Sequence, residues 1–182
     1  SDDRWLLCMP IARVGGLSIL TRCLAARRCV VLARSFDADR FPEWIATRHI
    51  TLVSLVPTML TRVFDAHPAW RPPSHLRAAL LGGASASTRL LQRAHERGMP
   101  IILTYGLTET CSQVAATPYA ARFAPADRGT GAPLSGIDIR VDNGHIQVRG
   151  PALMAGYWND APLAPDAWFD TGDLGEIDAD GC

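Results

Sequence analysis

The chain has 182 residues, 48% of them hydrophobic, and 18 basic residues balance 18 acidic ones. This composition supports one buried core, or one with a small appendage. The zero net charge, without a basic stripe interleaved with aromatics, argues against nucleic-acid binding. No apolar run reaches the roughly 18 residues of a membrane span, and residues 1–4 lack a signal-peptide pattern, so we expect a soluble, cytoplasmic protein.

The first half of the chain alternates strand-like and helical patterns, which is typical of a layered α/β sheet with mostly parallel strands. Short apolar runs rich in β-branched residues predict strands. Runs with helical spacing, begun by proline or serine, predict helices. The expected strands are 5–9, 29–32, 50–56, 78–81 and 101–104; the expected helices are 16–26, 41–48, 57–66 and a fourth that Ser85 or Ser87 caps and Gly98 stops.

Two segments follow predicted strands directly. Gly82-Gly83-Ala84 comes after 78–81, and Tyr105-Gly106 comes after 101–104. Ligands of open α/β sheets bind outside the carboxyl ends of the strands, and residues without bulky side chains let a ligand lie against the backbone. We therefore expect a ligand site here, although a tight turn would explain the glycines and an aromatic plug would explain Tyr105.

The pattern changes after about residue 127, where glycines and prolines interrupt the helical rhythm. Two strands, 137–141 and 145–149, flank Asn143-Gly144, a strong hairpin turn because both residues tolerate positive φ. A further strand is expected at 174–177. We predict an α/β subdomain over 1–128 and a small β-rich, barrel-like subdomain over 129–182 that stops without a returning strand.

Polar side chains concentrate in two short runs, 105–110 and 169–173. Thr108 and Glu109 supply a hydrogen-bond donor for phosphate and a hard oxygen ligand for magnesium. Asp173 supplies an acceptor for ribose hydroxyls, with a turn-forming aspartate as the alternative. Arg13 and Arg22 can bind a carboxylate bidentately, although solvated surface arginines would explain them equally well.

The two runs together resemble the signature of the adenylate-forming superfamily, which contains acyl-CoA synthetases, luciferases and the adenylation domains of peptide synthetases. Leu107 stands where the peptide-synthetase domains usually carry proline. The runs 6–22, 54–58, 80–84 and 105–110 are most similar to the o-succinylbenzoate–CoA ligases of menaquinone biosynthesis.

The resemblance implies an ATP-dependent ligase that forms an acyl-adenylate and then a coenzyme A thioester, with Mg²⁺ bound and an aromatic diacid as substrate. By motif match, Glu109 would hold magnesium, Thr108 would contact phosphate, and Asp173 would bind ribose. The adenine and acyl pockets would be framed by Gly82, Gly83, Ala84, Tyr105 and Gly106, with Arg13 or Arg22 gripping the second carboxylate.

The sequence departs from the family pattern at several points. It contains no lysine. The family has a phosphate loop that ends in lysine and normally precedes the segment that corresponds to residue 1. It also has an arginine-bearing hinge and a C-terminal domain with a catalytic lysine, both normally downstream of the segment that corresponds to residue 182. Arg13 replaces a histidine and Leu103 an asparagine. We expect part of a large N-terminal domain that is inactive alone; the alternatives are a general aryl or fatty acyl-CoA synthetase and a non-catalytic AMP- or ATP-binding module.

Overall fold

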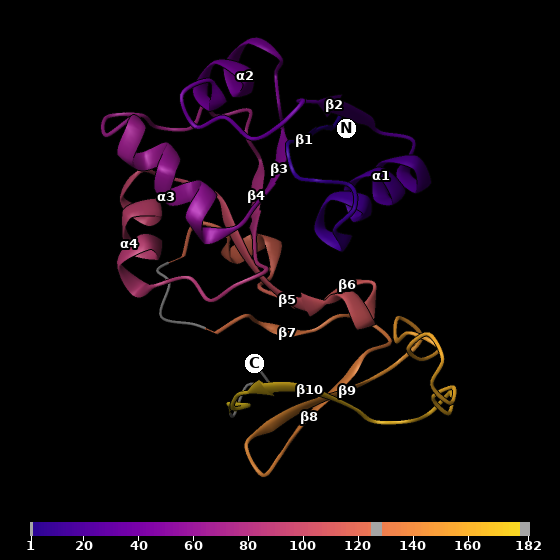
Figure 1. The fold of residues 1–182 in the computed structure, drawn as a ribbon. Coiled ribbons are helices and arrows are strands. Elements are labelled where there is room, and N and C mark those ends of the chain that lie inside the picture. The colour runs from indigo at the N-terminus through magenta and orange to yellow at the C-terminus, as the bar shows by residue number, and fades with distance from the viewer. Residues whose placement is uncertain (1, 125–128, 179–182) are drawn as a thin grey trace.

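A computed structural model describes residues 2–124 and 129–178 and contains two sheets (Figure 1). The larger has seven strands in the order β2-β1-β3-β4-β5-β6-β7, and the smaller has three in the order β10-β9-β8. The first five strands of the chain pair in parallel. The predicted α/β class with a mostly parallel sheet and a small β-rich part is therefore confirmed.

The parallel strands alternate with helices along the chain. The strands are β1 (Arg4–Leu7), β2 (Cys29–Leu32), β3 (Leu52–Leu55), β4 (Ala78–Leu81) and β5 (Ile101–Leu107). The helices are α1 (Val14–Ala26), α2 (Phe41–Thr47), α3 (Pro57–Ala66) and α4 (Thr88–Glu96). Each predicted element of this half is present, with ends shifted by a few residues at most.

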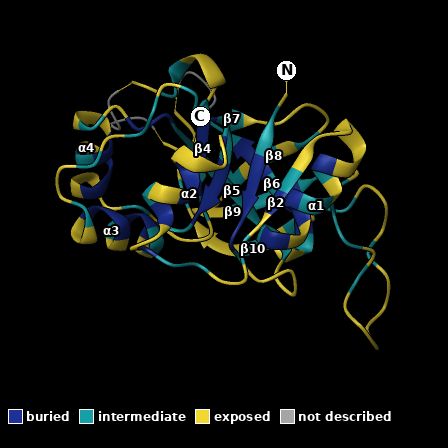
Figure 2. Cartoon of the chain, turned by 90° about the horizontal axis from the view of Figure 1, so that it is seen from above, coloured by how far each residue is buried: buried dark blue, intermediate teal, exposed yellow. Residues whose placement is uncertain are grey.

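Helices lie on both faces of the large sheet, and the central strands β1, β3 and β4 are mostly buried (Figure 2). Successive side chains of a strand point to opposite faces, so β1 contributes to two cores. Leu6 packs in the cluster that contains Phe41 of α2 and Val63 of α3. Trp5 and Leu7 pack with Ile19 and Cys23 of α1 on the other face.

The strand β5 runs further than the sequence predicts. It continues through Tyr105 and Gly106 to Leu107, because the chain turns at the 3-10 helix η1 (Thr108–Thr110) and returns as β6 (Ser112–Ala116), which pairs antiparallel with it. The expectation that Tyr105-Gly106 lies past the end of the strand is thus wrong, whereas Gly82-Gly83-Ala84 does follow β4.

The small sheet consists of β8 (Asp138–Asp142), β9 (His145–Arg149) and β10 (Phe169–Leu174). The hairpin turn is confirmed, with φ of 50° at Asn143 and 84° at Gly144. The strand expected at 174–177 is wrong: the strand begins earlier, because Phe169 and Asp170 pair with β9, and it includes Asp173.

Two short elements connect the sheets. The 3-10 helix η2 (Tyr119–Ala121) follows β6, and β7 (Ala132–Pro133) pairs with β6 at the edge of the large sheet. The division into subdomains at residue 128 stays a prediction, and residues 179–182 lie outside the described part of the chain. Among the described residues, no helix is long and apolar enough to span a membrane.

Candidate functional site

Close packing of neighbouring strands requires glycine at two of the predicted site positions. A Cβ on Gly82 would lie 2.3 Å from Thr104 Oγ1 and 2.8 Å from its carbonyl oxygen, and a Cβ on Gly106 would lie 1.8 Å from the carbonyl oxygen of Ser112. Distances this short are incompatible with a side chain. The glycines therefore fix how β4, β5 and β6 approach one another around the site.

A hollow of about 120 Å³ opens on one side of the glycine segment. Arg22 of α1 lines it together with Gly82, Gly83 and apolar side chains. The remaining lining residues are Met9, Val14, Gly15, Ser18, Ser54, Leu55, Val56, Leu80, Thr104, Gly106, Ser112 and Gln113.

Arg22 is a partly buried cation that lacks an acidic partner among residues 2–124 and 129–178. Its Nη1 donates to Ser18 Oγ at 3.1 Å, and Ser18 in turn donates to the carbonyl of Gly15. Burial lowers the pKa of the guanidinium from its ordinary value. A partly buried guanidinium without a carboxylate partner suits an anionic ligand. Arg13, the other predicted candidate, is exposed and does not line this hollow.

A second hollow has a volume of about 310 Å³ and also borders the glycine segment. Thr104 of β5 lines both hollows, while Gly82 and Gly83 line the first and Ala84 lines the second. The remaining lining residues of the second hollow are Leu81, Ser85, Ala86, Thr88, Leu91, Leu103, Gly129 and Thr130. The segment 82–84 thus contributes to the lining of both hollows.

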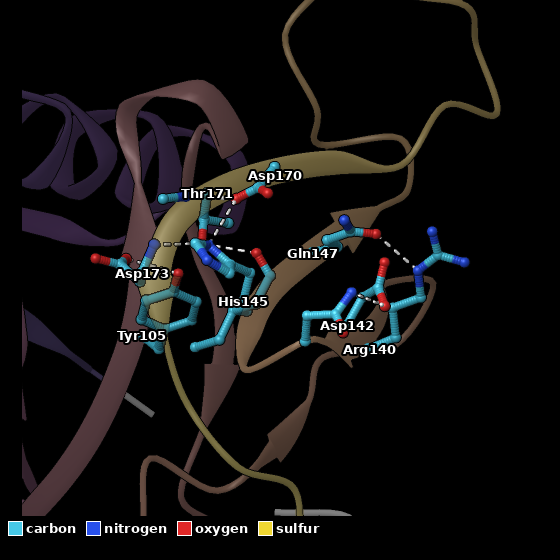
Figure 3. A network of polar contacts seen from close by, with 11 residues as sticks. Tyr105, Arg140, Asp142, His145, Gln147, Asp170, Thr171 and Asp173 are labelled. Carbon is cyan, nitrogen blue, oxygen red and sulfur yellow. Dashed lines mark hydrogen bonds and ion pairs between the residues drawn. The ribbon is translucent and has the colours of Figure 1, made fainter.

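The two polar runs meet at Tyr105 and Asp173. The Tyr105 hydroxyl on β5 donates to Asp173 Oδ2 on β10 at 2.8 Å (Figure 3). Thr171 supports this arrangement, because its Oγ1 accepts from the Asp173 amide and donates to the Ile146 carbonyl on β9. Burial raises the pKa of Tyr105 to about 12, and the bond to Asp173 adds to the rise, so the phenol stays a donor at neutral pH.

Glu109 contacts a different segment. Its Oε1 accepts from the Tyr157 hydroxyl at 2.9 Å, and its backbone carbonyl accepts from the Met154 amide at 2.7 Å. The hydrogen bond to the Glu109 carboxylate raises the pKa of the Tyr157 phenol above its ordinary value. Tyr157 could not be predicted from the sequence, because a single tyrosine in an irregular segment carries no pattern that indicates a partner 48 residues away.

The acids themselves stay apart from the hollows. Neither Glu109 nor Asp173 lines the first or the second hollow, and Thr108 is exposed beside Glu109. Within the part of the chain that the structure describes, no three histidine, cysteine or acidic side chains gather as a metal site would require. The site therefore offers one carboxylate, at Glu109, rather than a complete metal cage.

Comparison with known proteins identifies the family. Residues 1–158 match the model of the AMP-binding enzyme family. The chain belongs to this family.

Relatives within the AMP-binding family share both sequence and fold with the chain. It is 37% identical, over 99% of its length, to the 2-succinylbenzoate–CoA ligase of Bacillus cereus (strain Q1). Solved structures of o-succinylbenzoate coenzyme A synthetase (MenE) from Bacillus subtilis are similar at 32% identity over the whole chain. The TM-score is 0.87 for the complex with ATP and a magnesium ion and 0.89 for the complex with the acyl-adenylate OSB-AMP.

The chain spans only part of these proteins. It covers 40% of the length of the Bacillus cereus ligase and 40% of the Bacillus subtilis synthetase. The AMP-binding assignment and the fold thus extend over the chain, while the activity of a whole ligase involves a longer polypeptide than the one described here.

Proposed function

We propose that the protein carrying this chain is an ATP-dependent carboxylate–CoA ligase that acts on o-succinylbenzoate, in menaquinone biosynthesis. The observation that carries the proposal is the 2.8 Å hydrogen bond between Tyr105 and Asp173, which brings together two polar runs 59 positions apart in the sequence. The similarity to 2-succinylbenzoate–CoA ligases supports it. We place the reaction in the cytoplasm, where ATP and coenzyme A are available.

The nucleotide would lie along the segment from Tyr105 to Thr108. The Tyr105 ring offers a face for adenine beside Gly82, Gly83 and Ala84, because aromatic rings stack favourably on purines. Asp173 is the acceptor for ribose hydroxyls. Thr108, exposed at the start of η1, offers a hydroxyl donor for phosphate.

Magnesium fits the donor set at Glu109. Mg²⁺ keeps several waters and is usually held by one or two carboxylates together with substrate phosphates. One carboxylate at Glu109, without a cluster of acids in the described part of the chain, matches that preference better than a site for zinc or calcium. When bound, magnesium would neutralise phosphate charge; Glu109 supplies the oxygen ligand.

The first hollow would hold the acyl group. Apolar side chains such as Met9, Val14 and Leu80 suit an aromatic ring, and Arg22 suits a carboxylate. A diacid can therefore place one carboxylate on Arg22 and present the other toward Gly83, where the nucleotide side begins. Of the two arginines that the sequence suggests, we assign this role to Arg22.

The proposed chemistry has two steps. A carboxylate oxygen of the acid attacks the α-phosphorus of ATP, and the bond to pyrophosphate breaks. The sulfur of coenzyme A then attacks the acyl carbon, its thiol proton is lost, and AMP leaves. Residues of this chain bind and orient the reactants; any lysine that the reaction needs is not among its 182 residues.

Titration of the chain with AMP by calorimetry tests the nucleotide site. We expect one AMP per chain, and we expect Asp173→Asn to weaken binding by about tenfold, because it removes a charged acceptor. Asp170→Asn is the matched control, since Asp170 is an exposed acid on the same strand. Absence of AMP binding, or an equal effect of both substitutions, would contradict the proposal.

A further inference from the structure

Glu109 is held at two points by one loop. Both donors belong to the segment between β9 and β10. The Met154 amide donates to the backbone carbonyl of Glu109, and the Tyr157 hydroxyl donates to the Glu109 carboxylate. The two donors, Met154 and Tyr157, lie three positions apart in the chain. This double contact defines the position of the whole residue and not only of its side chain.

The loop itself is anchored by backbone hydrogen bonds on either side of Tyr157. The Leu163 amide donates to the carbonyl of Ala155 at 2.8 Å, and the Asp160 amide donates to the carbonyl of Tyr157 at 3.2 Å. Gly156, with φ of 143°, gives the chain the turn that precedes Tyr157. The tyrosine hydroxyl is therefore presented to Glu109 from a folded segment.

The chemistry of the partner matters as much as the geometry. Among residues 2–124 and 129–178, Glu109 forms no ion pair with an arginine or histidine. An arginine would orient the carboxylate but also neutralise it and compete with a cation. A neutral phenol donates one hydrogen bond to Oε1 and leaves the negative charge and the second oxygen available.

We propose that Tyr157 is a positioning residue that orients the Glu109 carboxylate for a divalent cation bound together with ATP. This inference rests on the proposed function, because it requires Glu109 to be the metal ligand. Hydrogen-bond partners of ligating carboxylates tune metal affinity in this way. Tyr157 acts through Glu109 and has no direct contact with the cation in this scheme.

The test compares the affinity of the chain for Mn²⁺·ATP, followed by water proton relaxation, with its affinity for ATP in the presence of a chelator. The ratio of the two dissociation constants isolates the contribution of the metal. The variants are Tyr157→Phe, Glu109→Gln and the double variant. Tyr119→Phe is the matched control, since Tyr119 is 45% exposed and Tyr157 is 53% exposed, and Tyr119 packs against arginines rather than a carboxylate.

We expect Tyr157→Phe to reduce the metal contribution by about threefold to tenfold. Loss of a hydrogen-bond partner of a metal ligand typically costs roughly 10- to 100-fold in metal affinity, and we expect less here because Tyr157 and Glu109 are partly exposed. Metal-free ATP affinity should be unchanged, Tyr119→Phe should behave as wild type, and the double variant should equal Glu109→Gln. The comparison of the double variant with Glu109→Gln separates a positioning role from a structural role. If Tyr157 had a structural role, Tyr157→Phe would lower the metal contribution further even in the absence of the Glu109 carboxylate.

Three outcomes would overturn the inference. If Tyr157→Phe leaves the metal contribution unchanged while Glu109→Gln lowers it, Glu109 is the metal ligand but Tyr157 does not position it. A further loss in the double variant would show that Tyr157 acts independently of Glu109. If Glu109→Gln itself changes nothing, or the wild type shows no metal contribution, the metal assignment in the proposed function fails and the role of Tyr157 fails with it.

Discussion

At Arg22, burial and charge oppose each other. The guanidinium lies inside a hollow whose walls are largely apolar, and burial disfavours its charged form. Its described hydrogen bond goes to Ser18, a neutral group that cannot offset the charge. A partly buried cation without an acidic partner favours a ligand that supplies the anion. Arg22 therefore favours the binding of an anionic group in the first hollow.

We predict that Arg22→Ala weakens binding of o-succinylbenzoate to the chain by about tenfold or more, because a hydrogen-bonded charge pair is lost. Benzoate, which lacks the second carboxylate, should bind both forms with similar affinity. Calorimetric titration of each ligand measures this. Arg13→Ala serves as control, since Arg13 is exposed outside the hollow. Equal losses for the two acids would show that Arg22 does not read the second carboxylate.

Single residues also show where sequence reasoning reaches its limit. The run around Tyr105 and the run around Asp173 could be recognised by composition and resemblance, and their hydroxyl–carboxylate contact is the structural consequence. Tyr157 and Ser18 could not be found in the same way. Each acts through one partner, Glu109 or Arg22, and a single side-chain contact leaves no periodic trace in the sequence.

At the scale of elements, hydrophobic periodicity predicted the parallel strands and the helices of the first half, because these carry strong local patterns. It failed at β6 and β10. Ser112–Ala116 is a strand of small and polar residues, and its pairing with β5 is set by the turn at η1 rather than by propensity. In β10 the register with β9 is irregular between Asp170 and Leu174, and Gly172 has φ of 75°, so the strand carries no alternating pattern that would predict it.

The beginning of α4 gives a test at this scale. The Ser87 hydroxyl accepts from the Leu90 amide at 3.3 Å, which caps the helix, so of the two predicted candidates Ser87 is the cap and Ser85 is not. We expect Ser87→Ala to lower the free energy of unfolding by about 1 kcal/mol in urea denaturation. Ser85→Ala should leave it nearly unchanged, and equal effects of the two substitutions would refute the assignment.

At the scale of the whole molecule, the site is built where the two sheets meet. β5 of the large sheet carries Tyr105, β10 of the small sheet carries Asp173, and the loop before β10 holds Glu109. The class of fold could be predicted because strands and helices alternate along the chain. The relative placement of the sheets could not, because it depends on contacts between residues far apart in sequence, such as Tyr105 with Asp173.

This arrangement also explains why the candidate site is shared between parts of the chain that differ in architecture. The glycine segment after β4 lines both hollows and the helix α1 lines the first, while the small sheet carries Asp173, the acceptor that we propose for ribose. Neither sheet alone contains all the groups that a mononucleotide requires. The central claim is therefore that AMP binds across both sheets.

A crystal structure of the chain with AMP tests this claim most directly. We predict electron density for adenine against the Tyr105 ring beside Gly82, Gly83 and Ala84, with ribose hydroxyls within hydrogen-bond distance of the Asp173 carboxylate. AMP bound elsewhere on the chain, with Asp173 still satisfied only by the Tyr105 hydroxyl, would contradict the account.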